Sequence, residues 1–128
     1  MPSLSDNGGI LSLVNSTGGT VNSYDYATIQ GNRFIVEGPA AGNGATVANG
    51  ALCRARPVGV WASKIHVAAP KTAGQAWTAG QTVYLISATN VWTTTKGTNL
   101  VGGIVAKDAA SADTTGDVLP GIPFVAAV

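Results

Sequence analysis

The sequence predicts an all-β protein, and three observations lead to this expectation. Short runs rich in β-branched and aromatic residues recur along the chain. Residues that accept turn conformations, such as Gly38-Pro39 and Asn49-Gly50, separate these runs. The best helical candidate, Lys107–Asp113, is too short to form a stable helix alone. We therefore expect a single-domain β-sandwich or jelly roll, or a small barrel.

Regular strand patterns begin at Arg33, and residues 33–128 form the expected β-domain. Each candidate strand is bounded by Gly, Pro, Asn or Asp, which supply the dihedral angles that turns need. The strand candidates are 33–37, 45–47, 52–55, 64–69, 82–87, 91–95, 100–106 and 118–128.

Residues 1–32 differ in composition and predict an extended N-terminal arm. They are rich in Ser, Asn, Gly and Thr, with one short apolar patch at Ile10–Val14. Pairs of glycines bracket this patch, so it forms an extended strand only if another segment supplies the partner edge. Tyr24 and Tyr26 follow at a spacing of two, which places both rings on one face of an extended chain.

Composition fits one domain with an unusually uncharged surface. The chain has 128 residues, of which 10% are charged and 45% hydrophobic, and its net charge is +1. Soluble domains usually have about 25% charged residues. Copies of such a protein repel one another weakly, so association is easy. This composition fits a coat-like protein and an ordinary β-domain with small surface residues equally well.

Basic residues concentrate in the middle of the chain, where residues 51–100 contain no acid. Arg54 and Arg56 are two positions apart on a candidate strand and should project from the same face. They can meet an acidic partner surface there. The alternative is that they are solvated charges that keep an exposed strand from aggregating.

The single cysteine, Cys53, cannot form an internal disulfide and is expected to be a small buried residue. Residues 1–32 contain no Lys or Arg and no long apolar run, so we expect neither a signal peptide nor a membrane segment, and synthesis in the cytosol. The Asn15-Ser16-Thr17 glycosylation sequon is then a chance match.

No pattern supports an enzyme, a cofactor or a metal site. The sequence has no Gly-x-Ser-x-Gly motif, and the only histidine, His66, has no recognisable nucleophile or acid beside it. Cys53 and His66 alone cannot form a zinc site. Asp108, Asp113 and Asp117 do not fit a calcium-loop spacing and are expected to be turn residues.

Two binding functions remain to be weighed from the residues. Net charge +1 gives little drive toward nucleic acid, and the tryptophans are not interleaved with Lys or Arg. Trp61, Trp77 and Trp92 can form a stacking platform for sugars, which makes a lectin-like or adhesin carbohydrate-binding module the alternative function. Their other expected role is to close the ends of the core.

Four blocks of the chain resemble, in order and spacing, the capsid cement family of tailed bacteriophages, which are small head-decoration proteins. The blocks are Pro70–Tyr84, Val91–Thr95, Asn99–Gly102 and Ala112–Val118, and the resemblance covers about Leu52 to Leu119.

This resemblance implies a non-enzymatic protein on the outer surface of the virion, made in the host cytoplasm. It would bind the major capsid protein and stabilise the DNA-filled head, as a homotrimer or alternatively a homodimer. It implies no catalytic residue, cofactor, nucleic acid or membrane. The residues we expect to contact the capsid or a sister subunit are Ile10, Leu11, Leu13, Val14, Tyr24, Tyr26, Arg54 and Arg56.

Five residues within the resembling blocks are expected to have structural roles. Gly74 and Gly80 permit turns, Trp77 covers the edge of the core, and Tyr84 holds a strand in place. Trp92 is expected to act in the same way.

Overall fold

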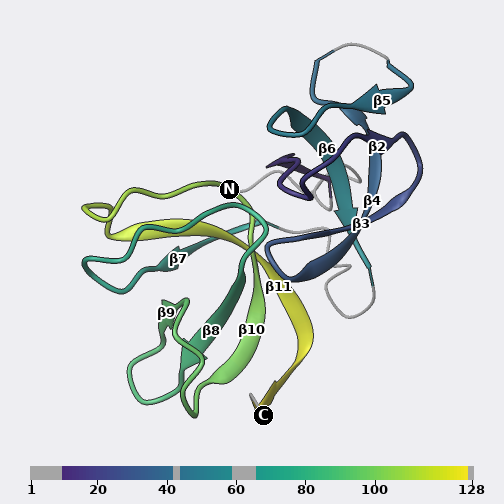
Figure 1. The fold of residues 1–128 in the computed structure, drawn as a ribbon. Helices are drawn as coiled ribbons and strands as arrows, with labels where there is room; N and C mark the ends of the chain where they lie inside the picture. The colour runs from purple at the N-terminus through teal and green to yellow at the C-terminus, as the bar shows by residue number, and fades with distance from the viewer. Residues whose placement is uncertain (1–9, 42–43, 59–65, 127–128) are drawn as a thin grey trace.

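The computed structural model describes residues 10–41, 44–58 and 66–126, with side chains up to Pro120. Its described residues contain no helix and form three antiparallel sheets, which confirms the prediction of an all-β protein (Figure 1). The strands are β1 (Leu11–Val14), β2 (Val21–Asn22), β3 (Tyr26–Ile29), β4 (Asn32–Pro39), β5 (Thr46–Val47), β6 (Leu52–Pro57), β7 (Val67–Pro70), β8 (Thr82–Ile86), β9 (Val91–Thr93), β10 (Leu100–Val105) and β11 (Thr115–Ala126).

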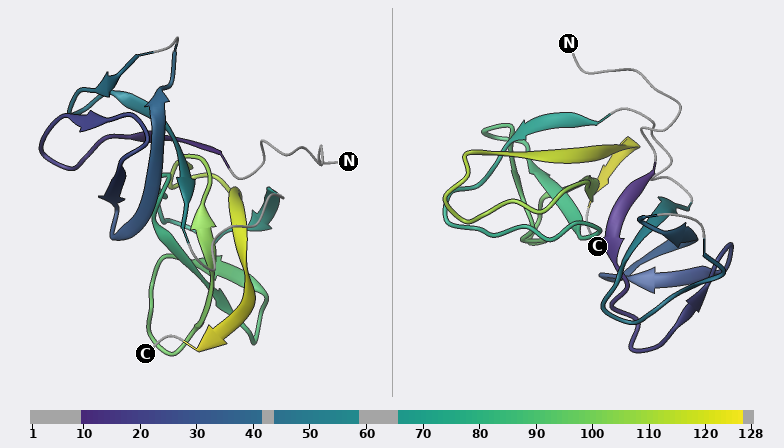
Figure 2. Two further views of the ribbon diagram at one scale, coloured as in Figure 1. Left: turned by 90° about the vertical axis from the view of Figure 1, so that its right-hand side faces the viewer. Right: turned by 90° about the horizontal axis from the view of Figure 1, so that it is seen from above.

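Two larger sheets lie side by side, as all three views show (Figures 1 and 2). The first has four strands in the order β1-β6-β4-β3, and the second has five in the order β7-β11-β10-β8-β9. A small pair, β2-β5, extends beyond the first sheet. Strands β2 and β3 were not among the strands expected from the sequence, because they are short and lie in a polar region.

The partner edge for the apolar patch comes from the same chain. Strand β1 pairs with β6, with Leu11 opposite Ala55 and Val14 opposite Leu52. Residues 26–29 form β3, which pairs with β4 through a turn at Gln30 and Gly31. The expected boundary between the arm (residues 1–32) and the β-domain (residues 33–128) thus falls at the start of β4. Strands β1 and β3 of the expected arm pair with strands β6 and β4 of the expected β-domain.

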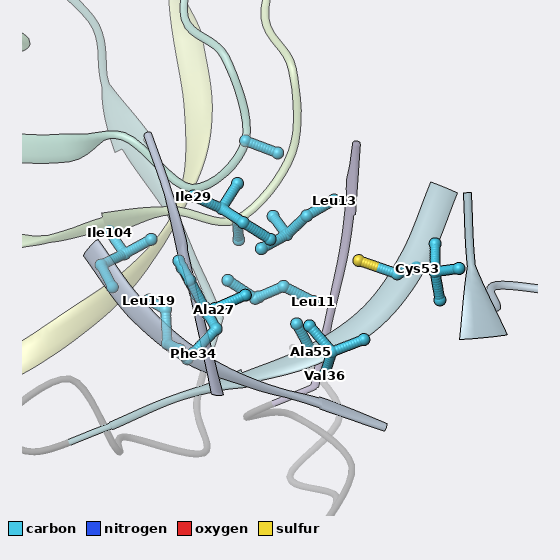
Figure 3. Close-up of a cluster of buried hydrophobic side chains, with 13 residues drawn as sticks. Leu11, Leu13, Ala27, Ile29, Phe34, Val36, Cys53, Ala55, Ile104 and Leu119 are labelled. Carbon is cyan, nitrogen blue, oxygen red and sulfur yellow. The ribbon is translucent and has the colours of Figure 1, made fainter. Parts of the chain in front are cut away.

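Alternation of side chains along the first sheet produces one buried face. In β4, Phe34 and Val36 are fully buried, whereas the alternating residues Arg33, Ile35 and Glu37 are not. Leu11 and Leu13 of β1 point into the same core, together with residues of β3 and β6 (Figure 3). Burying an aliphatic or aromatic side chain of this size contributes roughly 1.5–3 kcal/mol, so this core largely stabilises the sheet.

The second sheet curls until its first and last strands meet. Lys71, which follows β7, forms a bridge with Trp92 of β9, and the Thr72 amide donates to the Trp92 carbonyl at 2.9 Å. Trp77 and Trp92 lie inside the curl with aliphatic residues of β8, β10 and β11. The indole N–H of Trp77 donates to the Gln75 side-chain oxygen at 3.3 Å, so this buried donor is satisfied.

Strands β10 and β11 take part in both cores. Ile104 and Leu119 pack into the core of the first sheet, while their neighbours Val105 and Val118 pack into the curl of the second. Successive side chains of a strand point to opposite faces, so these two strands form a wall between the cores. The Asn32 amide adds a polar link, because it donates to the Gly80 carbonyl at 2.9 Å.

The alanine-rich segment 107–113 is a loop rather than a helix. Ala109 forms a two-way backbone bridge with Trp77, with N···O distances of 2.8 and 3.0 Å. This pairing uses backbone groups that a helix would need for its own hydrogen bonds.

Both buried tryptophans require glycine opposite their rings. A Cβ atom at Gly116 would lie 2.4 Å from the Trp77 ring, and one at Gly102 would lie 2.1 Å from the Trp92 ring. These distances are far shorter than any stable contact, so the two rings can occupy these positions only because residues 102 and 116 are glycines.

We predict that Gly116→Ala destabilises the protein by about 1–3 kcal/mol, because the new methyl group overpacks the Trp77 site. The melting temperature should fall by about 3–10 °C in a calorimetric scan. Gly19→Ala is the matched control, since nothing lies within 4 Å of a Cβ at that position. Equal melting temperatures for the two variants would contradict this account of the packing.

Candidate binding face

The face of the first sheet that points away from the core is the candidate binding site. We define this outer face by the exposed or half-buried side chains of its four strands. These residues are Ser12, Val14, Tyr26, Thr28, Arg33, Ile35, Glu37, Leu52, Arg54 and Arg56.

Strand register aligns the outer face into rows. Tyr26 on β3 lies opposite Ile35 on β4, which lies opposite Arg56 on β6. Val14 and Leu52 form another cross-strand pair, and they are 44% and 52% exposed. Because side chains on one face of paired strands touch their cross-strand neighbours, these residues form a continuous aromatic, aliphatic and cationic surface.

Two arginines on β6 have different environments although both point outward, as the sequence predicts. Arg56 forms an ion pair with Glu37 of β4. Arg54 lies opposite Ser12 and Gly38, and its Nε atom is buried without a hydrogen-bond partner in the described structure. The Arg56 charge is therefore already compensated, whereas no described carboxylate pairs with Arg54.

Arg33 and Tyr26 stabilise the edge of the outer face. The Arg33 guanidinium lies 5.5 Å from the centre of the Tyr26 ring and also donates to the Thr28 hydroxyl at 3.2 Å. Such a cation–π contact orients both side chains, yet Tyr26 remains 57% exposed.

Tyr24 lies in the turn just before β3, with its side chain 78% exposed. The spacing of Tyr24 and Tyr26 in the sequence predicts that both rings share a face of one extended segment. The structure instead gives Tyr24 a φ of 69°, which breaks the extended geometry between the two residues.

A groove of about 550 Å³ runs beside β1, between the first and second sheets. In the view from above, β1 lies on the side of its sheet nearer the second sheet (Figure 2). Val14, Leu52, His66 and Asp117 are among its lining residues. The buried Nε2 atom of His66 has no hydrogen-bond partner in the described structure.

The eight expected contact residues divide into three groups in the structure. Val14, Tyr26, Arg54 and Arg56 lie on the outer face, and Tyr24 lies beside it. Two others, Leu11 and Leu13, are buried in the chain's own core, and Ile10 is half-buried in the groove.

Six further residues of the outer face were not among the contact residues expected from the sequence, namely Ser12, Thr28, Arg33, Ile35, Glu37 and Leu52. Alternation within the candidate strand at 33–37 provides a signal for Arg33, Ile35 and Glu37, since every second residue there is apolar and buried.

Neither described tryptophan offers a stacking platform for sugars. Trp77 and Trp92 are 2% and 8% exposed, so their ring faces are covered by protein. Trp61 lies outside the described residues. The turn residues behave as backbone elements: Gly74 and Gly80 have φ values of 81° and 98°, and Tyr84 pairs with Thr93 and Val101.

Acidic side chains of the β10–β11 loop cap backbone groups. Asp108 accepts from the Ala79 amide at 2.7 Å, and Asp113 accepts from the Ala110 amide at 2.9 Å. In the described parts of the chain, no group of three His, Cys, Asp or Glu residues can hold a metal ion. Nor does any helix there have the length and apolarity to cross a membrane.

The thiol of Cys53 and the glycosylation sequon residue Asn15 are both buried. Cys53 is fully buried beneath the outer face, and burial raises the pKa of its thiol. Asn15 of the sequon is also fully buried, and its side-chain amide donates to the Gly19 and Val47 carbonyls.

These features define a class of protein, namely an all-β chain with one sheet face suited to binding another protein. The chain is all-β, and its outer face combines Tyr, Arg and aliphatic side chains, which is the composition of protein-binding surfaces.

Comparison with known proteins places the chain within that class. The model of the phage cement protein family matches residues 5–120, so the chain belongs to this family. No curated protein and no solved structure matches it. A cement protein is a structural component of the bacteriophage virion and associates with the capsid.

We predict that Cys53 resists alkylation in the folded protein. Its raised pKa lowers the thiolate fraction at pH 8, and burial blocks access of the reagent. Iodoacetamide should modify the native protein at least about 10-fold more slowly than the urea-unfolded protein, measured by intact mass. Similar rates in both states would show that this strand opens readily.

Proposed function

We propose that this protein binds the outer surface of the major capsid protein lattice and stabilises the DNA-filled head. The outer face of the first sheet is the surface that makes this contact. The proposal requires no catalytic step, because adhesion alone holds neighbouring capsid subunits together. The family match over residues 5–120 supports an association with the capsid. The composition of the outer face supports its assignment as the surface that makes the contact.

The observation that carries the proposal is the cross-strand alignment of aromatic, aliphatic and cationic side chains on the outer face. Tyr26, Ile35 and Arg56 lie side by side on three strands, and Val14 and Leu52 extend the apolar area. Tyr and Arg are enriched among residues that dominate binding energy, and a paired sheet holds them rigidly. A rigid face loses little conformational entropy when it docks.

Arg54 is the residue we expect to meet an acid of the capsid. Its charge has no partner among the described residues, while the neighbouring Arg56 is paired with Glu37. An unpaired cation at an interface gains more from a partner carboxylate than one that is already neutralised.

We further propose that the protein acts as a homotrimer, or alternatively as a homodimer. A net charge of +1 imposes little repulsion between copies. Several outer faces in one oligomer would bind adjacent capsid subunits together, and modest contacts then give strong overall attachment.

Binding to capsids that lack this protein tests the proposal directly. Purified protein should co-sediment with such heads at a saturating copy number and should raise the temperature at which they release DNA. Saturable binding without any gain in head stability would remove the stabilising role, and protein that stays in the supernatant would refute the capsid contact.

We predict that Arg54→Gln raises the Kd for capsids about 10-fold, whereas Arg56→Gln raises it by less than about 3-fold. Both substitutions lie on β6 and remove one positive charge, so the change in net charge is matched. Titration of heads with labelled protein measures both values. Equal losses would indicate a general charge effect and contradict a specific role for Arg54.

A further inference from the structure

The backbone at Tyr24 has a geometry that normally requires glycine. Its φ of 69° lies in the left-handed region, where a bulky side chain is disfavoured. The Asp25 amide donates to the Asn22 carbonyl at 3.2 Å, so Tyr24 is the third residue of a tight turn. A positive φ at this turn position usually selects Gly or Asn.

The same residue begins a β-bulge against β4. The Tyr24 amide donates to the Val36 carbonyl at 2.5 Å, and the Val36 amide donates to the Asp25 carbonyl at 2.9 Å. Two residues thus face one residue across the ladder, which is the pattern of a bulge whose first position favours glycine. The turn and the bulge therefore disfavour tyrosine for the same reason.

Surrounding contacts hold this strained backbone in place. The Ser23 amide donates to the Ala45 carbonyl at 2.8 Å, and its hydroxyl donates to the Gly44 carbonyl at 2.7 Å. With the two bonds to Val36, these contacts fix the turn on both sides. Hydrogen bonds thus hold the backbone at Tyr24, while its side chain is exposed to solvent.

Folding gains nothing visible from this tyrosine. Its side chain is 78% exposed and makes no hydrogen bond, ion pair or ring contact within the described residues. Backbone strain that the surrounding contacts maintain, at a residue whose side chain the fold does not use, points to a functional use of the residue.

Arg54 lies close to the Tyr24 turn. A Cβ atom built on Gly38 would lie 3.3 Å from Arg54 Nη2 and 3.5 Å from Ser23 Oγ, so the guanidinium and the turn converge over this glycine. The turn that carries Tyr24 and the Arg54 guanidinium, which no described carboxylate pairs, therefore lie close together beside the outer face.

We propose that Tyr24 is the anchor residue of the capsid contact, and that it enters an apolar pocket on the capsid surface with a carboxylate at the rim that pairs with Arg54. The inference rests on the proposed function and names the chemistry of its partner site. A preformed turn presents the ring without the cost of ordering its backbone on binding, and a smaller ordering cost raises affinity.

The test uses Tyr24→Asn, because Asn accepts the left-handed conformation and removes the ring. This variant should melt at or slightly above the wild-type temperature, since strain is relieved, and its Kd for capsids should rise at least about 30-fold. Tyr24→Gly should lose the same affinity, and Tyr24→Phe should retain the wild-type Kd within about 3-fold.

Gln30→Asn is the matched control, since Gln30 also has a positive φ of 52° in an exposed turn. It should leave the Kd unchanged. Wild-type affinity in Tyr24→Asn would overturn the anchor role while leaving the capsid contact intact, whereas a wild-type protein that fails to bind heads would refute the proposed function itself. A Tyr24→Asn variant that melts well below wild type would instead assign the residue to folding.

Discussion

Pairing of β4 with β6 is the interaction on which the candidate site depends. The register places Val36 opposite Ala55 in the core and Ile35 opposite Arg56 on the outer face. Because strand side chains alternate with a period of two, a slip of one residue would exchange these two sets. The buried Phe34 and Val36 therefore fix which side chains are available for binding.

An irregularity in the same pairing shapes the edge of that face. The register shifts between Val36 and Gly38, so Glu37 is inserted into the ladder and reaches Arg56. Gly38 then lies opposite Arg54 and leaves room for its guanidinium. One bulged residue thus gives the two arginines of β6 different electrostatic environments, a result that their equivalent positions in sequence do not suggest.

Local patterns predicted the parts of the fold that depend on neighbours in sequence. Alternation and turn residues located β4, β6, β8, β9 and β10, and strand periodicity placed Arg54 and Arg56 on one face. The partner of β1 could not be derived, because Leu13 meets Cys53 only through long-range pairing. The positive φ of Tyr24 was equally hidden, since turn statistics point to Gly or Asn at such a position.

The double role of β10 and β11 has a consequence for how the molecule comes apart. Val105 and Ile104 are adjacent in the chain but belong to different cores, as do Val118 and Leu119. Detaching either strand would expose apolar surface on both sides at once. Loss of order in one half should therefore spread to the other in a single cooperative transition, so that mechanical load on one sheet is resisted by the packing of both.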